Sequence, residues 1–209
     1  MMSKRMLILA PHTDDGEFGC GGTIARYIEE GWEAHYVAFS GCRESLDRKL
    51  PPDTLIHELG EATSVLGIDR SRVQVLDFPV RRFPELRQEI LEVLVKLKAN
   101  IKPDLVFLPS VDDTHQDHQQ VAQEGFRAFK ATCMLGYEMP WNNLTFTTTS
   151  FCRLEREHLQ KKIAAMKCYK SQSHRSYSSE EFILALARTR GTQIGVPWAE
   201  AFQLSRWVM

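Results

Sequence analysis

The stretch MLILAPHTDDGEFGCGGTIARYIEEG, residues 6–31, decides the fold class of this chain. Its first five residues are an uninterrupted apolar run, which is typical of a strand buried on both faces, as in parallel sheets. A glycine-rich turn at Gly19–Gly22 leads into Thr23–Glu30, where apolar residues recur at helical spacing. The next apolar segment, His35–Phe39, predicts a second strand. Residues 6–39 therefore predict a right-handed β-α-β unit.

Strands and helices continue to alternate beyond this unit. We expect helices at Thr54–Leu66 and Pro84–Ala99, strands at Val73–Phe78 and Asp104–Pro109, and a polar loop at Ser40–Asp53. This alternation predicts an α/β fold of three layers, a Rossmann-like sandwich in which a mostly parallel sheet has helices on both faces.

The last third of the chain has a less regular pattern. The expected elements are helices at Gln119–Thr132 and Glu155–Cys168, a strand within Leu144–Cys152, a loop at Gly136–Asn143 and an ambiguous segment at Ala199–Val208. Because there is no internal repeat and no linker, we expect residues 1–209 to form a single domain.

Composition excludes several classes of protein. The 209 residues are 43% hydrophobic and 25% charged, with 26 Lys and Arg against 27 Asp and Glu, which is typical of a globular chain and not of a disordered one. A net charge of −1 argues against nucleic acid or an anionic membrane surface as a partner. The apolar run at residues 6–10 is too short to span a bilayer, so we expect no transmembrane segment.

The five cysteines contain no Cys-x-x-Cys pair, which excludes a zinc ribbon. An odd number of widely spaced cysteines favours reduced thiols and a cytoplasmic protein, with one disulfide plus free thiols as the alternative.

Polar residues follow the first and fourth predicted strands. Because the carboxyl ends of parallel strands lie at one edge of a sheet, both sets should meet there. The two segments, residues 11–17 and 110–118, together supply His12, Asp14, Asp15, Asp112, Asp113, His115, Asp117 and His118. Carboxylates crowded around imidazoles are costly unless a cation neutralises them, which predicts a metal site. Two His and one Asp suit catalytic zinc, and Fe(II) is the alternative.

Two simpler interpretations compete with a metal site. Each segment alone is typical of a turn that ends in an N-capping Asp, but their occurrence at equivalent strand ends favours the metal. The glycine-rich segment does not match a dinucleotide fingerprint, because Ile24 stands where the third glycine belongs, and no phosphate-binding Gly-Lys-Ser/Thr follows. Close packing of a helix is the favoured explanation for these glycines.

The sequence resembles the PIG-L/LmbE-like zinc-dependent de-N-acetylases. The resemblance rests on residues 10–15 with 19–24, on residues 103–106 leading to 115–118, and on Ala199–Phe202. It covers nearly the whole chain and implies an LmbE-like fold.

The resemblance also implies a role for each motif residue. It implies that His12, Asp15 and His118 hold Zn²⁺ and that Asp14 is the general base. His115, oriented and kept protonated by Asp117, would stabilise the oxyanion. The implied substrate is a small acetamido sugar or a conjugate that contains N-acetylglucosamine, and a homo-oligomer is left open.

Substrate contacts follow the family pattern less closely. Relatives carry an Arg near the start of the helix expected at Thr54, which this chain lacks. Arg43, Arg81 or Arg82 are candidates to replace it, and Tyr137 and Trp141 are candidates to face a sugar ring.

Three functions from different classes remain. The sequence favours a hydrolase that removes an N-acetyl group. A non-catalytic carbohydrate-binding module on the same fold is the first alternative, although such a module has no use for an unligated Asp beside a metal. A nucleotide-binding oxidoreductase is the second.

Overall fold

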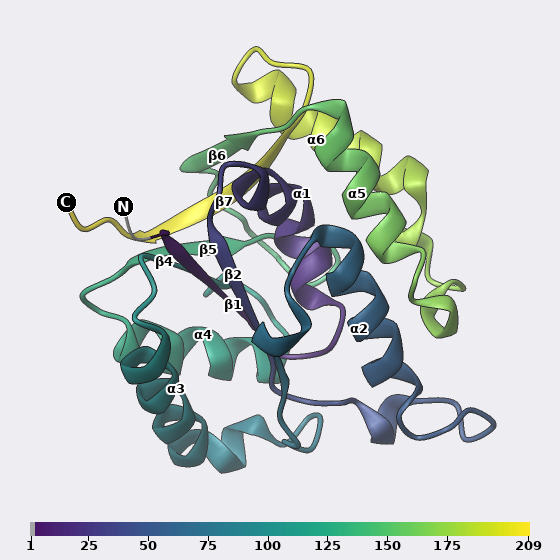
Figure 1. Ribbon diagram of the computed structural model, residues 1–209, viewed down its shortest axis with the longest axis vertical. Helices are drawn as coiled ribbons and strands as arrows, with labels where there is room; N and C mark the ends of the chain where they lie inside the picture. The colour runs from purple at the N-terminus through teal and green to yellow at the C-terminus, as the bar shows by residue number, and fades with distance from the viewer. Residues whose placement is uncertain (1–2) are drawn as a thin grey trace.

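The computed structural model describes residues 3–209. Its seven strands form one sheet in the order β3-β2-β1-β4-β5-β7-β6 (Figure 1). The strands are β1 (Arg5–Ala10), β2 (Glu33–Ala38), β3 (Val73–Val75), β4 (Leu105–Pro109), β5 (Cys133–Tyr137), β6 (Ser150–Arg153) and β7 (Ala199–Arg206). Strands β1 to β5 pair in parallel, and β7 runs antiparallel to both of its neighbours, β5 and β6.

Helices cover both faces of this sheet. In Figure 1, α3 and α4 lie on one side of the strands, and α1, α2, α5 and α6 lie on the other. The helices are α1 (Asp15–Glu29), α2 (Thr54–Leu66), α3 (Arg87–Ile101), α4 (Gln116–Ala128), α5 (Arg156–Met166) and α6 (Glu180–Gln193). The expected three-layer α/β sandwich with a mostly parallel sheet is therefore confirmed.

The central strand β1 explains why its sequence is apolar at every position. Met6, Ile8 and Ala10 belong to the core beneath α1, α2 and α5, whereas Leu7 and Leu9 belong to the core beneath α3 and α4. All five are completely buried. A strand that contributes to both cores cannot alternate polar and apolar residues.

The glycine-rich segment is not the turn that the sequence predicts. Helix α1 begins at Asp15 and runs through Gly19–Gly22, with one non-helical residue, Cys20 (φ −147°, ψ 21°). The glycines permit close packing: a Cβ at Gly19 would lie 2.4 Å from the ring of Tyr137, and one at Gly22 would lie 2.6 Å from Leu154. Close helix packing, the favoured explanation, accounts for both residues.

The C-terminal third differs most from expectation. Strand β5 occupies part of the segment predicted as a loop, because pairing with β4 on one side and β7 on the other outweighs the low strand propensity of Gly136. The ambiguous Ala199–Val208 segment forms β7, and β6 occupies only the end of the predicted strand. Helix α6 lies where the sequence analysis assigns no element.

The N-terminal two thirds need smaller corrections. Strand β3 is shorter than predicted, and a 3₁₀ turn at Phe83–Leu86 precedes α3 where one helix was expected. Helix α4 begins at Gln116, three residues earlier than predicted, which brings His118 into its first turn. Within residues 3–209, every helix is too short or too polar to cross a membrane.

Candidate metal centre

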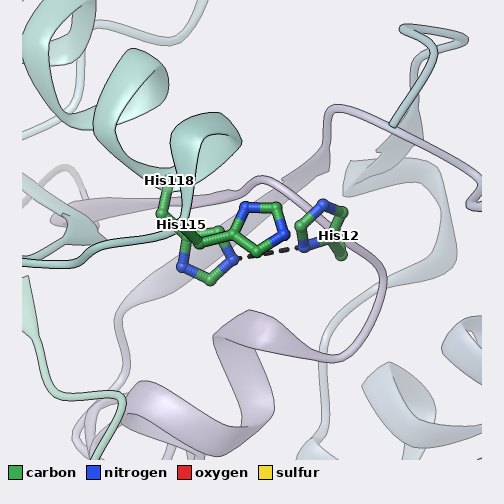
Figure 2. A group of neighbouring side chains, drawn as sticks. All are labelled: His12, His115 and His118. Carbon is green, nitrogen blue, oxygen red and sulfur yellow. Dashed lines mark hydrogen bonds between the residues drawn. The ribbon is translucent and has the colours of Figure 1, made fainter. Parts of the chain in front are cut away.

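Three imidazoles meet where β1 and β4 end. The two strands are parallel neighbours, with Ile8 opposite Phe107, so the segments that follow them emerge side by side. His12 lies in the loop after β1, and His115 and His118 lie at the start of α4. Figure 2 shows these two rings reaching from α4 toward His12, with a hydrogen bond between His118 Nε2 and His12 Nδ1.

Three potential ligand atoms form an equilateral triangle. His12 Nδ1, Asp15 Oδ2 and His118 Nε2 lie 3.2 Å from one another. Ligands held about 2.0–2.1 Å from a tetrahedral zinc ion are separated by about 3.3–3.4 Å. The spacing and the donor types of this ligand cluster, His12, Asp15 and His118, therefore fit zinc.

His115 stands beside the ligand cluster. A second group that fits a metal consists of the three histidines, whose nearest nitrogens lie within 4.8 Å of one another. Both groups contain His12 and His118. The third member is Asp15 in the ligand cluster and His115 in the second group. The Asp15 group has the tighter spacing and is more deeply buried, so it is the stronger candidate.

Each ligand imidazole has a buried carboxylate on its other nitrogen. His118 Nδ1 lies 2.7 Å from Asp113 Oδ2, and His12 Nε2 lies 3.1 Å from Asp117 Oδ2. Such partners fix the tautomer and orientation of a metal-binding histidine. Sequence reasoning gave Asp113 no individual role, although its position in the acidic run five residues before His118 was a usable signal.

The predicted contact between Asp117 and His115 is wrong. The Asp117 carboxylate accepts hydrogen bonds from the Arg81 backbone N–H (2.6 Å) and contacts His12. Only the Asp117 backbone N–H reaches His115, donating to Nδ1 at 3.2 Å. Burial, followed by the charges of His118 and His12, lowers the pKa of His115. Because the side chain of Asp117 points at His12, it does not hold His115 in the protonated form.

The carboxylates dominate the electrostatics of the ligand cluster. Burial opposes protonation of His12, but the adjacent Asp15 raises its pKa to about 9. His118 behaves similarly, with a pKa of about 10, because Asp15 and Asp113 outweigh its burial. Burial would raise the pKa of Asp15, but His118 and His12 hold it well below its usual range. The cluster favours positive charge, as a metal site should.

Asp14 is placed differently from Asp15. It precedes α1 as the N-cap residue, yet its side chain makes no capping hydrogen bond. Burial and the charge of Asp15 raise the pKa of Asp14 to about 6. Because the Asp14 carboxylate lines a cavity and does not cap the helix, the simple turn interpretation does not account for it.

Two tyrosines hold the loop that carries these residues. The hydroxyls of Tyr36 and Tyr169 donate to the Thr13 carbonyl at 2.9 and 2.8 Å. Both hydroxyls also contact Glu17, whose pKa burial raises to about 8. All four residues are buried. The sequence analysis assigned no role to residues 169–172, and this contact supplies one for Tyr169.

The ligand cluster opens into a cavity of about 340 Å³. We call the residues around it that lie outside the two motifs the cavity wall. The cavity wall includes Arg81, Trp141, Gln172, Arg175 and Tyr177. Arg81 and Trp141 were predicted, whereas the other three were missed because residues 170–178 carry no periodic pattern. A cavity of this size suits a small organic ligand.

The three other predicted substrate contacts lie elsewhere. Tyr137 is completely buried in β5, where its hydroxyl donates to the Leu9 carbonyl at 2.9 Å. Its placement in a loop was wrong, and the ring does not line the cavity. Arg43 forms an ion pair with Asp77, and Arg82 with Glu85, both away from the cavity lining.

Arg81 has an unusual backbone conformation. Its φ of 66° is in the left-handed region, which costs free energy for a residue with a Cβ. The hydrogen bond from its N–H to Asp117 Oδ2 holds this conformation. Within residues 3–209, the Arg81 guanidinium has no carboxylate partner, so it is available to the cavity.

Aromatic rings form one side of the cavity wall. Trp141 and Tyr177 stack with ring centroids 3.9 Å apart and planes 12° apart. Phe18 meets both rings edge-on at 5.1 and 5.3 Å. The Arg175 guanidinium lies over Tyr177 at 5.6 Å. An aromatic surface beside polar groups suits the apolar face of a sugar ring.

Comparison with known proteins gives a family match and several similar curated proteins, two of which are described here. Residues 7–129 match the model of the PIG-L family, described as GlcNAc-PI de-N-acetylase. The uncharacterized deacetylase YaiS of Escherichia coli K12 is 29% identical over 177 residues, covering 80% of this chain and 91% of YaiS. The diacetylchitobiose deacetylase of Thermococcus kodakarensis is 26% identical over 141 residues, covering 64% of this chain and 51% of that enzyme.

One solved structure with the same fold is that of a hydratase, not of a deacetylase. The 4-carboxy-2-hydroxymuconate hydratase of Pseudomonas putida KT2440 superposes with a TM-score of 0.79 at 21% identity, over 99% of this chain and 98% of the hydratase. The fold alone therefore does not distinguish amide hydrolysis from hydration. The family match spans more than half of the chain and includes both halves of the ligand cluster. On this match, the chain belongs to the PIG-L family of GlcNAc-PI de-N-acetylase-like proteins.

Proposed function

We propose that this protein is a zinc-dependent N-deacetylase that acts on a small acetamido sugar or a conjugate containing N-acetylglucosamine. The observation that carries the proposal is the 3.2 Å triangle of His12, Asp15 and His118 atoms beside the uncapped carboxylate of Asp14 in one cavity. The family match and the deacetylase relatives support the same reaction.

His12, Asp15 and His118 would hold the metal. Zinc suits this donor set better than Fe(II), because Fe(II) triads of this type usually lie on all-β scaffolds. When bound, zinc supplies a Lewis acid for the amide carbonyl and lowers the pKa of water to about 7. Asp113 and Asp117 keep the two imidazoles oriented for this task.

Asp14 is the general base of the proposed reaction. Its carboxylate lines the cavity, and a pKa of about 6 suits a group that accepts a proton at neutral pH and returns it. Asp14 takes the proton from the attacking water and delivers it to the departing amine. Asp15, held well below its usual pKa, stays ionised as a ligand.

His115 donates a hydrogen bond to the oxyanion. Because its Nδ1 accepts from the Asp117 backbone N–H, a neutral His115 carries its hydrogen on Nε2. The lowered pKa of His115 favours this neutral donor over the cation that the sequence analysis expected. A preorganised donor of this kind stabilises the tetrahedral intermediate.

The cavity wall would bind the sugar. Trp141 offers a ring face, and Arg81 offers an unpaired guanidinium in the place of the Arg that the family carries near α2. All five cysteines are free thiols, which supports a cytoplasmic location. A carbohydrate-binding module remains the alternative, but it gives Asp14 no purpose.

The test is acetate release by the purified full chain. The protein is stripped with a chelator, reloaded with zinc, and given N-acetylglucosamine, N,N′-diacetylchitobiose and glycosides of N-acetylglucosamine. We expect acetate and a free amine in equal amounts, activity lost on chelation and restored by zinc. Sugar binding without acetate release would favour the binding module. Absence of both metal binding and turnover would overturn the proposal.

A further inference from the structure

Helix α1 is interrupted by two side chains from distant parts of the chain. In a continuous helix, the Gly22 N–H would donate to the Phe18 carbonyl four residues earlier. Here the Gly22 N–H donates to Glu200 Oε1 at 3.1 Å, and Lys162 Nζ donates to the Phe18 carbonyl at 2.6 Å. Lys162 and Glu200 also contact each other at 2.6 Å. One helical hydrogen bond has therefore been replaced by an inserted ion pair.

Glu200 also satisfies the next residue of the helix. Its Oε2 accepts from the Thr23 N–H at 2.7 Å and from the Thr23 hydroxyl at 2.6 Å. Glu200 thus caps the second part of α1 at its N-terminus, while Lys162 caps the carbonyl end of the first part. Each charge has the sign that the helix dipole favours at that position.

We call Lys162 and Glu200 the kink clamp. Both side chains are buried, at 5% and 7% exposure. A Cβ at Gly21 would lie 3.2 Å from Lys162 Cγ, and one at Gly22 would lie 3.2 Å from Glu200 Oε1. The glycines and the kink clamp therefore fit together as one unit. A buried ion pair is weak evidence for stability alone, so its geometry needs another explanation.

The first part of α1 carries the acidic half of the candidate metal centre. It is one short turn that starts at Asp15, directly after Asp14, and Phe18 lies at its end. Asp15 Oδ2 must stay 3.2 Å from His118 Nε2, which belongs to a different helix. The direction of this turn sets that distance, and the kink at Cys20 sets the direction of the turn.

We propose that Lys162 and Glu200 are positioning residues for the metal centre: by holding α1 in its kinked form, they place Asp14 and Asp15 against the histidines. The proposal gives a role to the C-terminal Ala199–Phe202 motif, which the catalytic groups leave unexplained. This inference rests on the proposed function, because it takes the Asp15 carboxylate to be a metal ligand.

Removal of the kink clamp should let α1 become continuous. In the double variant Lys162→Met/Glu200→Leu, neither a buried charge nor a side-chain hydrogen-bonding group remains to separate the Gly22 N–H from the Phe18 carbonyl. The two groups would then bond directly, and the first turn would swing away from His118. Each single variant leaves one charge unpaired and should unfold more easily than the double variant.

The experiment measures zinc affinity by competition with a chelating dye, together with thermal unfolding, for both single variants and the double variant of the full chain. We expect zinc affinity to fall about tenfold or more in all three, as for other residues that support metal ligands. The double variant should recover thermal stability but not zinc affinity. Affinity that recovers with stability, or that stays within about twofold of wild type, would overturn the proposal.

The matched control is a second buried ion pair that does not enter α1. Glu138 and Arg190 contact each other with 8% and 17% side-chain exposure. Glu138→Leu/Arg190→Met should leave zinc affinity within about twofold of wild type. An equal loss of affinity in this control would show that any buried pair has the same effect, and would also overturn the proposal.

A crystal structure of the double variant separates this inference from the proposed function. We expect a hydrogen bond from Gly22 N to the Phe18 carbonyl and a displaced Asp15. Retention of the kink with Asp15 in place would overturn the inference even if wild type binds zinc. A wild-type chain that binds no zinc would instead overturn the metal site, and the position of α1 would still decide the role of the kink clamp.

Discussion

In the ligand cluster, each imidazole is backed by a buried carboxylate, whereas in the cavity wall the side chains contact one another and solvent. His118 is 2% exposed and Trp141 is 38% exposed. The ligand cluster comes from segments that directly follow adjacent strands, whereas a large part of the cavity wall comes from loops and 3₁₀ turns at residues 141–142 and 172–177. The difference indicates that the sheet positions the candidate metal ligands, and we expect substrate preference to depend on the loops.

The largest effect on activity should come from substituting the proposed base, Asp14, or a proposed metal ligand, His118. Asp14→Asn should lower kcat by about 10²–10⁴ while zinc stoichiometry, measured by atomic absorption, stays at the wild-type level. His118→Ala should lose the metal itself. Equal metal loss in both variants would show that Asp14 is a ligand, and would remove the distinction between Asp14 and Asp15.

The metal-free protein should become less stable as pH rises above neutrality. The pKa values of His12 and His118 are raised from 6.5 to about 9 and about 10, so their stabilisation is complete below pH 6.5 and is lost as pH rises through those values. The raised pKa of Glu17 acts in the same direction. Chemical denaturation of chelated protein should show a loss of a few kcal/mol between about pH 6.5 and 10.

Zinc provides the control for this pH dependence. A bound metal requires neutral imidazoles, so the stabilisation by zinc should grow over the same pH range. A metal-free chain whose unfolding free energy stays flat or rises from pH 6.5 to 10 would contradict the electrostatics of the ligand cluster.

The carboxylates behind the imidazoles should have an intermediate effect. Asp113→Asn should weaken zinc binding about 10- to 100-fold, because an uncharged amide with one oxygen cannot serve both the His115 backbone N–H and His118 Nδ1 as the carboxylate does. Asp112→Asn is the matched control, since Asp112 contacts Gln203 and not a ligand. Titration with a chelating dye measures both affinities, and equal values for the two variants would argue against a role for Asp113.

The smallest effect should come from the cavity wall. Trp141→Ala should raise KM about 2- to 10-fold with little change in kcat, because an aromatic contact contributes about 0.5–1.5 kcal/mol. Steady-state kinetics on the best acetamido sugar measures this split. A fall in kcat with unchanged zinc binding would place Trp141 with the catalytic groups and weaken the contrast between the two regions.

Much of the fold could be predicted because its signals are local. The run Met6–Ala10 predicted a strand buried on both faces, and Thr54–Leu66 predicted α2 to the residue, with Gly67 at φ 91° ending the helix. Strand β5 was missed although Cys133–Leu135 is a similar apolar run, because Gly136 is a weak strand former until β4 and β7 flank it. Helix α6 was missed although Ser179 caps it.

Residue types and strand ends were enough to gather the candidate site, since parallel strands deliver their following loops to one edge. The partners within the site were not predictable in this way. Asp117 lies two residues from His115 in sequence, but its carboxylate contacts His12 across 105 positions. Tyr137 is an aromatic residue of the kind that contacts sugars, but it is completely buried in the core. Its residue type alone could not reveal this burial.

The sequence by itself determined the fold class, the two motifs and the residues available to hold a metal, because apolar periodicity and strand order act over short stretches. Only the tertiary structure decided which atom faces which. The 3.2 Å triangle, the carboxylate behind each imidazole and the ion pair inserted into α1 each join segments far apart in the chain. Their geometry depends on how helices and strands pack, and packing is a property of the whole core rather than of any one segment.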